Sequence, residues 1–445
     1  MNVFRKNRQV IIAIFNLLAL FSKKCLTGIY LERGLLMSEK TKQLLQRIRS
    51  DLREITPSKI REFDQEVSSI PGIIKLTLGE PDFNTPEHIK EAGILSIKNN
   101  HTHYPTSIGT FGLRQAAANF LDRKYNLKYD YENVIVTVGA TEAISAAIGS
   151  IINPGKGEKI ILPTPIWPMY IPITKMHGAE PIFINTSKDN YILRPQRLKA
   201  ALDKYGDQVK GVILNFPANP TGITYSRKDV QAIVTVLQGY NVFVISDEIY
   251  SELTYGKKHV SVAEYLPDQT ILINGVSKSH AMTGWRIGII CAPKVIVKEI
   301  FKLHQFSVTT ATYAAQDAAQ EAFENGFNDS QAMKAQYQQR GSFVYQELKA
   351  IGFEVLKPQG AFYIFFKLPT WLNEDEFCHE LAYDYQVAVA GCTPFGPGGE
   401  GHIRISYASS MKNLKAAMKR MKEYVAEKKK QVGIANTQPT EIAKS

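Results

Sequence analysis

The chain has 445 residues, of which 44% are hydrophobic and 21% charged, a composition typical of globular proteins. This length suffices for two or three domains, and the composition excludes a collagen, a disulfide scaffold and a largely disordered chain. The net charge is +11, but six basic residues against one acidic residue lie within residues 1–36. The charge therefore does not indicate a nucleic-acid-binding surface, and we expect no nucleic-acid partner.

Residues 1–36 are predicted to be a leader that is not part of the fold. Their apolar run, residues 10–21, is shorter than the roughly 20 residues that a membrane-spanning helix needs. Basic residues flank the run as in a signal peptide, but no A-x-A-like cleavage site follows it. The interpretation that we favour is that Met37 is the true first residue and that residues 1–36 are upstream sequence. We expect no membrane partner.

The segment after the leader is predicted to be an N-terminal arm. Apolar residues recur at helical spacing between residues 38 and 61, at Leu44, Leu45, Ile48 and Leu52. A later apolar run ends in the turn Gly79-Glu80-Pro81. We assign residues 37–80 to this arm and to a first segment of a smaller domain.

Residues 81–320 are predicted to form a large α/β domain. Short β-branched runs alternate there with helical stretches, which indicates a mainly parallel seven-stranded sheet covered by helices on both faces. The runs lie at residues 134–138, 159–162, 181–184, 212–215, 242–246, 270–274 and 285–291. Sheets of this kind bind ligands at the carboxyl ends of their strands.

The last third of the chain has a different pattern. Residues 296–346 have the pattern of a long helix, and short strand-like runs at 353–356, 361–366, 387–390 and 402–407 then mix with helices. This pattern predicts a smaller α+β domain over residues 321–426. Residues 427–445 are polar and lysine-rich, and we expect them to be a disordered tail.

The four cysteines give no sign of metal or disulfide chemistry. No two of them are spaced as a C-x-x-C pair, so a zinc or thioredoxin-like site is unsupported. They are Cys25, Cys291, Cys378 and Cys392. We expect no bound metal and a reducing, cytoplasmic location.

Lys278 directly follows a predicted buried strand, and Arg286 lies eight residues further on. A lysine at a strand end is more often a surface residue whose amine reaches water. The pair also suits a lysine that forms a Schiff base beside an arginine that holds a phosphate.

Asp247 follows the apolar run 242–246, and Tyr250 comes three residues later. A carboxylate at the end of a buried strand is costly unless it meets a cation, and a protonated pyridine nitrogen would be such a cation. The alternative is an aspartate that caps a helix.

Two further turns follow predicted strands. Asn219-Pro220-Thr221-Gly222 comes after the run 212–215, where a plain turn is the alternative. Gly139-Ala140-Thr141 opens a predicted helix, whose free backbone N–H groups can bind a phosphate.

Together these segments resemble the class I/II aminotransferases, which use pyridoxal 5′-phosphate on fold type I, over roughly residues 70–424. Residues 275–288 match the family's lysine signature, and the Asn219 turn and the Asp247-x-x-Tyr250 segment fall in the family's order. One position departs from part of the family: Gly275 stands where some members have a phosphate-binding serine, so one phosphate hydrogen bond is in doubt.

The resemblance implies a role for each matching residue. Lys278 would link covalently to the cofactor and act as the catalytic base, and Asp247 would bind the pyridine nitrogen. Tyr250 and Asn219 would hydrogen-bond the phenolic oxygen. The other implied contacts are Gly139, Ala140, Thr141 and Arg286 at the phosphate, Trp167 on the ring, and Tyr104 from a neighbouring subunit. The Tyr104 role implies a homodimer.

The resemblance also implies substrate contacts. Arg404 would grip the substrate carboxylate in a bidentate fork, and Gly79, Trp167 and Asn219 would lie beside the substrate. The alternative for Arg404 is an exposed arginine on an edge strand.

The implied activity is transfer of the amino group of an L-amino acid to a 2-oxo acid such as 2-oxoglutarate, a step of amino-acid metabolism. No Arg or Lys lies between Lys128 and Lys156 to bind a distal carboxylate. Residues 78–86 and 137–143 resemble Gram-positive bacterial enzymes for aromatic amino acids and their relatives that act on aspartate or N-acetyl-diaminopimelate. We favour aromatic substrates, with those relatives' substrates as the alternative.

Two other classes are weighed against this activity. The same fold hosts pyridoxal-phosphate lyases that cleave C–S bonds, which would release pyruvate and ammonia without an oxo-acid acceptor. A transcription regulator with an aminotransferase-like domain would need an N-terminal DNA-binding domain. The segment before Ile70 is too short for one and has no helix-turn-helix pattern.

Overall fold

The computed structural model describes residues 38–433, and the chain divides into two units, Met1–Thr56 and Pro57–Ser445. The described part of the first unit contains two short helices, α2 (Glu39–Gln46) and α3 (Ser50–Glu54). Ser38 begins α2 by accepting a hydrogen bond from the backbone N–H of Thr41. The predicted leader, residues 1–36, lies outside the described residues.

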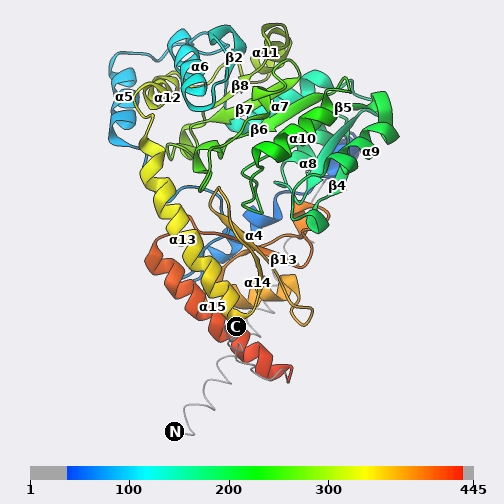
Figure 1. The fold of residues 1–445 in the computed structure, drawn as a ribbon, viewed down its shortest axis with the longest axis vertical. Coiled ribbons are helices and arrows are strands. Elements are labelled where there is room, and N and C mark those ends of the chain that lie inside the picture. Colours follow the sequence, from blue (N-terminus) through cyan, green and yellow to red (C-terminus); the bar gives the residue numbers. More distant parts are fainter. Residues whose placement is uncertain (1–37, 434–445) are drawn as a thin grey trace. The chain divides into compact units, whose positions relative to one another are not determined.

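The second unit contains a seven-stranded sheet in the order β2-β8-β7-β6-β5-β3-β4 (Figure 1). Strand β8 is antiparallel to β2 and β7, and the other neighbouring strands are parallel. The strands are β2 (Val134–Thr137), β3 (Lys159–Thr164), β4 (Glu180–Asn185), β5 (Val209–Asn215), β6 (Phe243–Asp247), β7 (Thr270–Gly275) and β8 (Gly288–Cys291). Each overlaps one predicted run, so the mainly parallel α/β sheet is confirmed.

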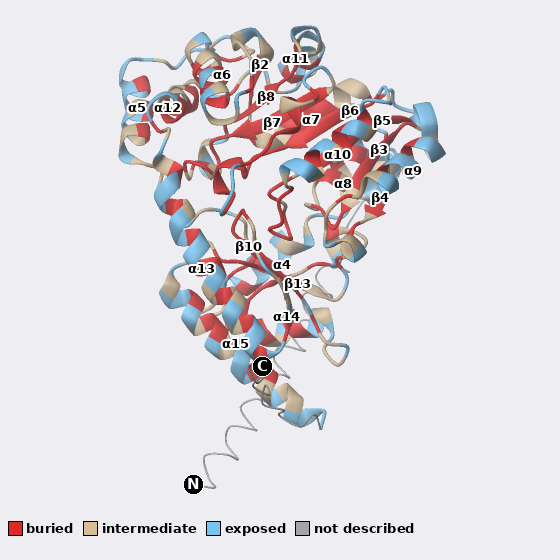
Figure 2. Cartoon of the chain, in the orientation of Figure 1, coloured by how far each residue is buried: buried red, intermediate tan, exposed pale blue. Residues whose placement is uncertain are grey.

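Helices cover both faces of this sheet. Successive residues of each strand point to opposite faces, and both faces are apolar and must be buried. Ile135, Ile213 and Ile245 pack in one cluster with α7 (Gly139–Ile151), and Val212 and Leu214 pack in another. All of these strand residues are buried, and the central strands of the sheet are mainly red, the colour of buried residues, in Figure 2. The large domain also contains α5 (Glu87–Lys98), α6 (Phe111–Tyr125), α8 (Tyr170–Met176), α9 (Pro195–Tyr205) and α10 (Arg227–Leu237).

The predicted long helix over residues 296–346 is wrong, because the chain forms three helices there. They are α11 (Lys294–Val308), α12 (Tyr313–Glu324) and α13 (Asp329–Ile351). Thr309 has a φ of 68°, which a right-handed helix cannot contain. The break lets α12 turn back and pack its alanines against α6, an arrangement that only tertiary contacts select.

A second, antiparallel sheet has the order β12-β13-β10-β9, and β1 pairs with β11 separately. Its core is shared with α13 and two later helices. The elements are α4 (Lys59–Val67), β1 (Ile74–Lys75), β9 (Glu354–Leu356), β10 (Tyr363–Lys367), α14 (Glu374–Tyr383), β11 (Val387–Ala388), β12 (Ala390–Gly391), β13 (His402–Ser406) and α15 (Met411–Gln431). The predicted run 387–390 is thus divided between two sheets.

Helix α15 continues to Gln431, so residues 427–431 are helical and not the start of a disordered tail. The lysines of this last turn suit the negative end of a helix, and Lys428 also lies 2.7 Å from the Glu380 carboxylate. Residues 434–445 lie outside the described part. The other domain boundaries stay predictions. Between residues 38 and 433, no helix combines the length and the apolar character that crossing a bilayer requires.

Candidate functional site

The candidate site lies at the carboxyl edge of the seven-stranded sheet. Strands β5 and β6 end side by side at Asn215 and Asp247, which pair in register. Strand β7 is the next neighbour and leads directly to Lys278. Strand β2 ends at Thr137, opposite the start of β8, so Gly139 and Arg286 reach the same edge. Parallel topology therefore collects the predicted residues of four strands in one place.

Lys278 is partly buried and directs its amine to the chain segment before α5. Its Nζ donates to the carbonyl oxygen of Gly79 at 2.7 Å. Burial lowers the pKa of Lys278 to about 8; the carboxylates of Glu80 and Asp247 oppose this, while Arg286 and Arg404 add to it. The alternative of a surface lysine is contradicted. An amine with this pKa is partly neutral near physiological pH, as a base or nucleophile requires.

Asp247 is 3% exposed and forms no ion pair within the described chain. Its Oδ2 accepts a hydrogen bond from Tyr170 Oη at 2.6 Å, and its Oδ1 accepts one from the Ile249 N–H at 3.1 Å. Burial raises the pKa of Asp247 to about 6, although the two hydrogen bonds lower it. The hydrogen bond from the Ile249 N–H is the kind of local contact that a capping aspartate makes, but it uses only Oδ1, and Oδ2 faces Tyr170 from a distant part of the chain. A buried carboxylate of this kind is suited to a cationic ligand.

Tyr250 and Tyr363 form a buried pair whose hydroxyl oxygens lie 2.7 Å apart. Burial raises the pKa of Tyr250 well above its usual value, so the phenol stays protonated and can donate a hydrogen bond. The ring of Tyr250 lies 5.8 Å from Lys278 Nζ. The phenol of Tyr250 is therefore a hydrogen-bond donor close to the lysine.

Arg404 is 4% exposed and lies on β13, which pairs with β12 on one side and β10 on the other. The alternative of an exposed arginine on an edge strand is therefore wrong. Its Nη1 donates to Asn219 Oδ1 at 2.8 Å, its Nη2 donates to the Thr77 carbonyl, and its guanidinium lies 4.6 Å from the Tyr363 ring. Its Nε has no partner in the described chain, and no carboxylate pairs with it.

The turn that carries Asn219 is tied to the end of β6. Asn215 Nδ2 donates to the Asp247 carbonyl at 3.1 Å, and Asn215 Oδ1 accepts from the Asn219 N–H at 3.1 Å. The Asn215 side chain thus ties Asn219 to the end of β6, and Asn219 in turn contacts Arg404.

Gly139, Ala140 and Thr141 begin α7, and Arg286 lies against them. Gly139 has a φ of 72°, and a Cβ there would collide with the Arg286 guanidinium. Arg286 is exposed, and its Nη1 donates to the Thr283 carbonyl at 3.0 Å. A helix N-terminus, a glycine without a side chain and an arginine together suit a phosphate.

The remaining predicted residues differ in how they relate to this group. Trp167 packs edge-on against Tyr170, with ring centroids 5.3 Å apart, and so lies two contacts from Asp247. Gly79 joins the group through its carbonyl and Lys278. Tyr104 is 87% exposed, and the described residues do not bring it to the others.

Sequence reasoning missed four residues of this group. They are Tyr170, Tyr363, Thr77 and Asn215, each of which positions a predicted side chain. No local signal identifies the first three, because their partners lie 77, 113 and 327 residues away. Asn215 alone had a signal, a polar side chain at the end of an apolar strand.

Comparisons with known proteins bear on this geometry. A family model described as "Aminotransferase class I and II" matches residues 71–421. The probable N-acetyl-LL-diaminopimelate aminotransferase of Bacillus subtilis (strain 168) is 43% identical over 86% of this chain and 97% of its own length. The aromatic-amino-acid aminotransferase 2 of Thermococcus litoralis is 33% identical, over 85% and 98%. The aspartate aminotransferase of Thermus thermophilus, solved with maleate, superposes with a TM-score of 0.79 at 30% identity, over 84% and 99%.

Proposed function

The chain belongs to the class I and II aminotransferase family, whose members depend on pyridoxal 5′-phosphate, and we propose how its own residues serve that activity. The proposed reaction transfers the amino group of an L-amino acid to a 2-oxo acid. One observation carries it: Arg404 is a buried cation in the same group as Lys278, and its Nε has no partner among residues 38–433. A buried guanidinium without an anion is costly, and the carboxylate common to amino acids and 2-oxo acids would compensate it.

The described residues fit the cofactor. Asp247 is a buried carboxylate without an ion-pair partner in residues 38–433, which suits a protonated pyridine nitrogen. The helix start at Gly139 and the Arg286 guanidinium suit the phosphate, and Tyr250 suits the phenolic oxygen. When bound, pyridoxal phosphate supplies an aldehyde that takes up the amino group and a ring that withdraws electrons.

The chain's own contribution is to hold groups in place and to move a proton. Arg404 and Asn219 would orient the substrate carboxylate. Lys278 would take the proton from the substrate Cα, and its lowered pKa keeps part of the amine neutral for this step. The hydrogen bond from Tyr170 keeps Asp247 more ionised than burial alone would allow.

For the amino donor we propose an aromatic L-amino acid, with 2-oxoglutarate as acceptor. The segment between Lys128 and Lys156 offers no cation for a distal carboxylate, and a relative at 33% identity is named for aromatic amino acids. The second candidate is N-acetyl-diaminopimelate, because a relative named for it is 43% identical over nearly its whole length.

We further propose that the enzyme is a cytoplasmic homodimer in which Tyr104 reaches the neighbouring subunit. The 87% exposure of this large aromatic side chain supports the proposal, because exposed aromatic residues are common where two proteins meet. Light scattering on the purified protein tests it, and a monomeric mass would contradict it.

The activity is tested with a donor panel and one variant. We expect amino transfer to 2-oxoglutarate from phenylalanine or tyrosine, compared with aspartate and N-acetyl-LL-diaminopimelate. Pyruvate and ammonia released from cystathionine without any acceptor would instead indicate a C–S lyase.

Borohydride treatment of the wild-type holoenzyme should add the mass of the cofactor at Lys278, and Lys278→Ala should abolish both this addition and amino transfer. Lys294→Ala is the matched control, since Lys294 is exposed and pairs with Asp130 and Glu132. Normal turnover by Lys278→Ala would overturn the assignment.

A further inference from the structure

A second pocket, of about 270 Å³, lies between the end of α6, the segment 251–259 and the start of α13. Five basic side chains contribute to its lining: Arg123, Lys124, Lys257, Lys258 and Lys334. Its lining has one acidic residue, Glu252. None of these residues belongs to the catalytic group described above, so the pocket needs its own explanation.

The acidic residue does not balance the basic ones. The Glu252 carboxylate lies 2.7 Å from Lys124 Nζ and also accepts from Ser330 Oγ at 2.9 Å. Within residues 38–433, no carboxylate lies within ion-pairing distance of Arg123, Lys257, Lys258 or Lys334. The pocket therefore holds a strong local excess of positive charge.

Two of the cations are held in place by an aromatic ring. The Arg123 guanidinium lies 4.1 Å and Lys124 Nζ 4.0 Å from the centroid of the Phe327 ring. Lys334 is partly buried, which lowers the pKa of its amine despite the nearby Glu252. Fixed cations lose little freedom when an anion binds, so they favour affinity.

The most informative residue of the lining is His259. Its side chain is 1% exposed, and its Nε2 lies 2.7 Å from the Glu248 carboxylate. Its ring packs between Phe216 and Tyr125, with centroids 5.5 and 5.4 Å away. Its Nδ1 is buried and has no hydrogen-bond partner in the described chain. A buried nitrogen without a partner is costly, unless a ligand or water completes it.

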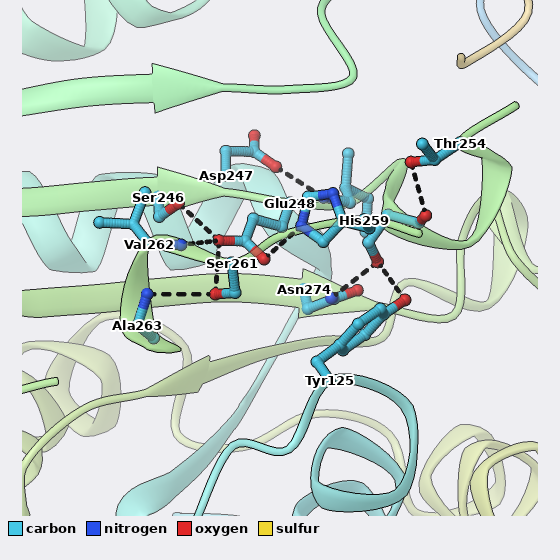
Figure 3. Close-up of polar contacts among 12 residues, drawn as sticks. Tyr125, Ser246, Asp247, Glu248, Thr254, His259, Ser261, Val262, Ala263 and Asn274 are labelled. Carbon is cyan, nitrogen blue, oxygen red and sulfur yellow. Dashed lines mark hydrogen bonds and ion pairs between the residues drawn. The ribbon is translucent and has the colours of Figure 1, made fainter. Parts of the chain in front are cut away.

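Glu248 fixes which nitrogen of the imidazole is free. Its carboxylate accepts from Ser246 Oγ at 2.7 Å, from Ser261 Oγ at 2.8 Å and from the Val262 N–H at 3.3 Å (Figure 3). These donors all reach Oε1, and the other oxygen, Oε2, faces His259 Nε2, so an accepting carboxylate oxygen places the hydrogen of this contact on Nε2. In that tautomer Nδ1 is an acceptor, so it is left to accept a hydrogen bond from a hydroxyl of the ligand or from a water that the ligand holds.

We propose that this pocket binds a small multivalent anion that carries phosphate or carboxylate groups. Cations that have no ion-pair partner in the described part of the chain would supply charge at the mouth, and His259 would supply a directed polar contact at the base. The inference goes beyond the aminotransferase activity and does not rest on it, because none of the catalytic residues lines the pocket.

The test uses the holoenzyme, so that the cofactor occupies its own phosphate site. Titration calorimetry at low ionic strength measures binding of inorganic pyrophosphate and of citrate, without amino acid or oxo acid. The variant is Lys257→Gln/Lys258→Gln, since both side chains are exposed and their loss leaves the core intact. The control is Lys415→Gln/Lys422→Gln, which removes the same charge from the exposed face of α15.

We expect one saturable site in the wild type, about tenfold weaker in the pocket variant and unchanged in the control, with affinity falling as salt is added. Binding of pyrophosphate alone would identify a phosphate ligand, and binding of citrate alone a carboxylate ligand. An absence of saturable binding at millimolar concentrations, or equal weakening in both variants, would overturn the proposal. Because no turnover is measured, this result is independent of whether the enzyme transfers amino groups.

Discussion

Tyr170→Phe is the substitution that best tests the electrostatics of the site. It removes one hydroxyl, which donates to Asp247 Oδ2 at 2.6 Å, and keeps the buried ring that packs against Trp167. A hydrogen bond to a charged group is worth about 1.5–3 kcal/mol, which corresponds to a rise of about 1–2 in the pKa of the carboxyl. We therefore expect the pKa of Asp247 to rise from about 6 in the cofactor-free protein to about 7.5.

The consequence is an affinity for pyridoxal phosphate that depends on pH. At about pH 7, a carboxyl with a pKa of about 6 is about 90% ionised, whereas one with a pKa of about 7.5 is about 25% ionised. Only the ionised form attracts the protonated pyridine nitrogen, so Tyr170→Phe should bind the cofactor about fourfold more weakly at that pH. At about pH 9 both carboxyls are ionised, and the difference should disappear.

The assay is a fluorescence titration of cofactor-free protein with pyridoxal phosphate across this pH range. Tyr424→Phe is a matched control, because Tyr424 is also buried and also donates to a carboxylate, Glu380 Oε2 at 2.9 Å, on α14. The control should follow the wild type throughout. Equal affinities of Tyr170→Phe and wild type at neutral pH, or a loss that persists undiminished in alkali, would refute the reasoning.

Three further predictions concern neighbouring groups. Arg404→Lys should raise KM for the amino donor about tenfold or more while kcat changes less, since a lysine cannot reproduce the planar fork; steady-state kinetics check this, and an unchanged KM would argue against the carboxylate role. Gly79→Ala should lower the free energy of unfolding by about 1–3 kcal/mol and weaken substrate binding, because its Cβ would collide with the buried Tyr363 hydroxyl. Calorimetry and steady-state kinetics measure the two effects, and an unchanged stability together with an unchanged KM would contradict the prediction. The pKa of Lys278 is lowered from 10.5 to about 8. Between those two pH values the unfolded chain therefore keeps the proton on Lys278, whereas the folded chain has lost it. Stability of the cofactor-free protein should therefore rise by up to about 3 kcal/mol between those pH values, and urea unfolding of Lys278→Met should lack this rise.

How far the sequence predicts the site depends on how local each signal is. Lys278, Asp247 and Asn219 follow strands that are apolar and β-branched, and a polar residue after such a run is visible without a structure. Tyr170 and Tyr363 give no such signal, because each acts through a partner that folding brings from far along the chain. The three helices between residues 294 and 351 were missed for a related reason. The first break, residues 309–312, contains no glycine or proline, and the packing of α12 against α6 distinguishes it from a continuous helix. The second break, residues 325–328, does carry a local signal, the Asn325-Gly326 pair.

The adjacent acids Asp247 and Glu248 show why the chemistry of a residue follows from its surroundings more than from its type. Neighbouring residues at a strand end point to opposite faces, so one chain step separates two environments. Asp247 receives two hydrogen bonds and lies in the catalytic group, where burial keeps its pKa near 6. Glu248 receives three hydrogen bonds from serines and backbone, and holds His259 at the base of the basic pocket. If the catalytic group and the basic pocket bind their ligands as proposed, the end of one strand orients a ligand contact on each side. Glu248→Gln should then weaken anion binding more than it weakens cofactor binding.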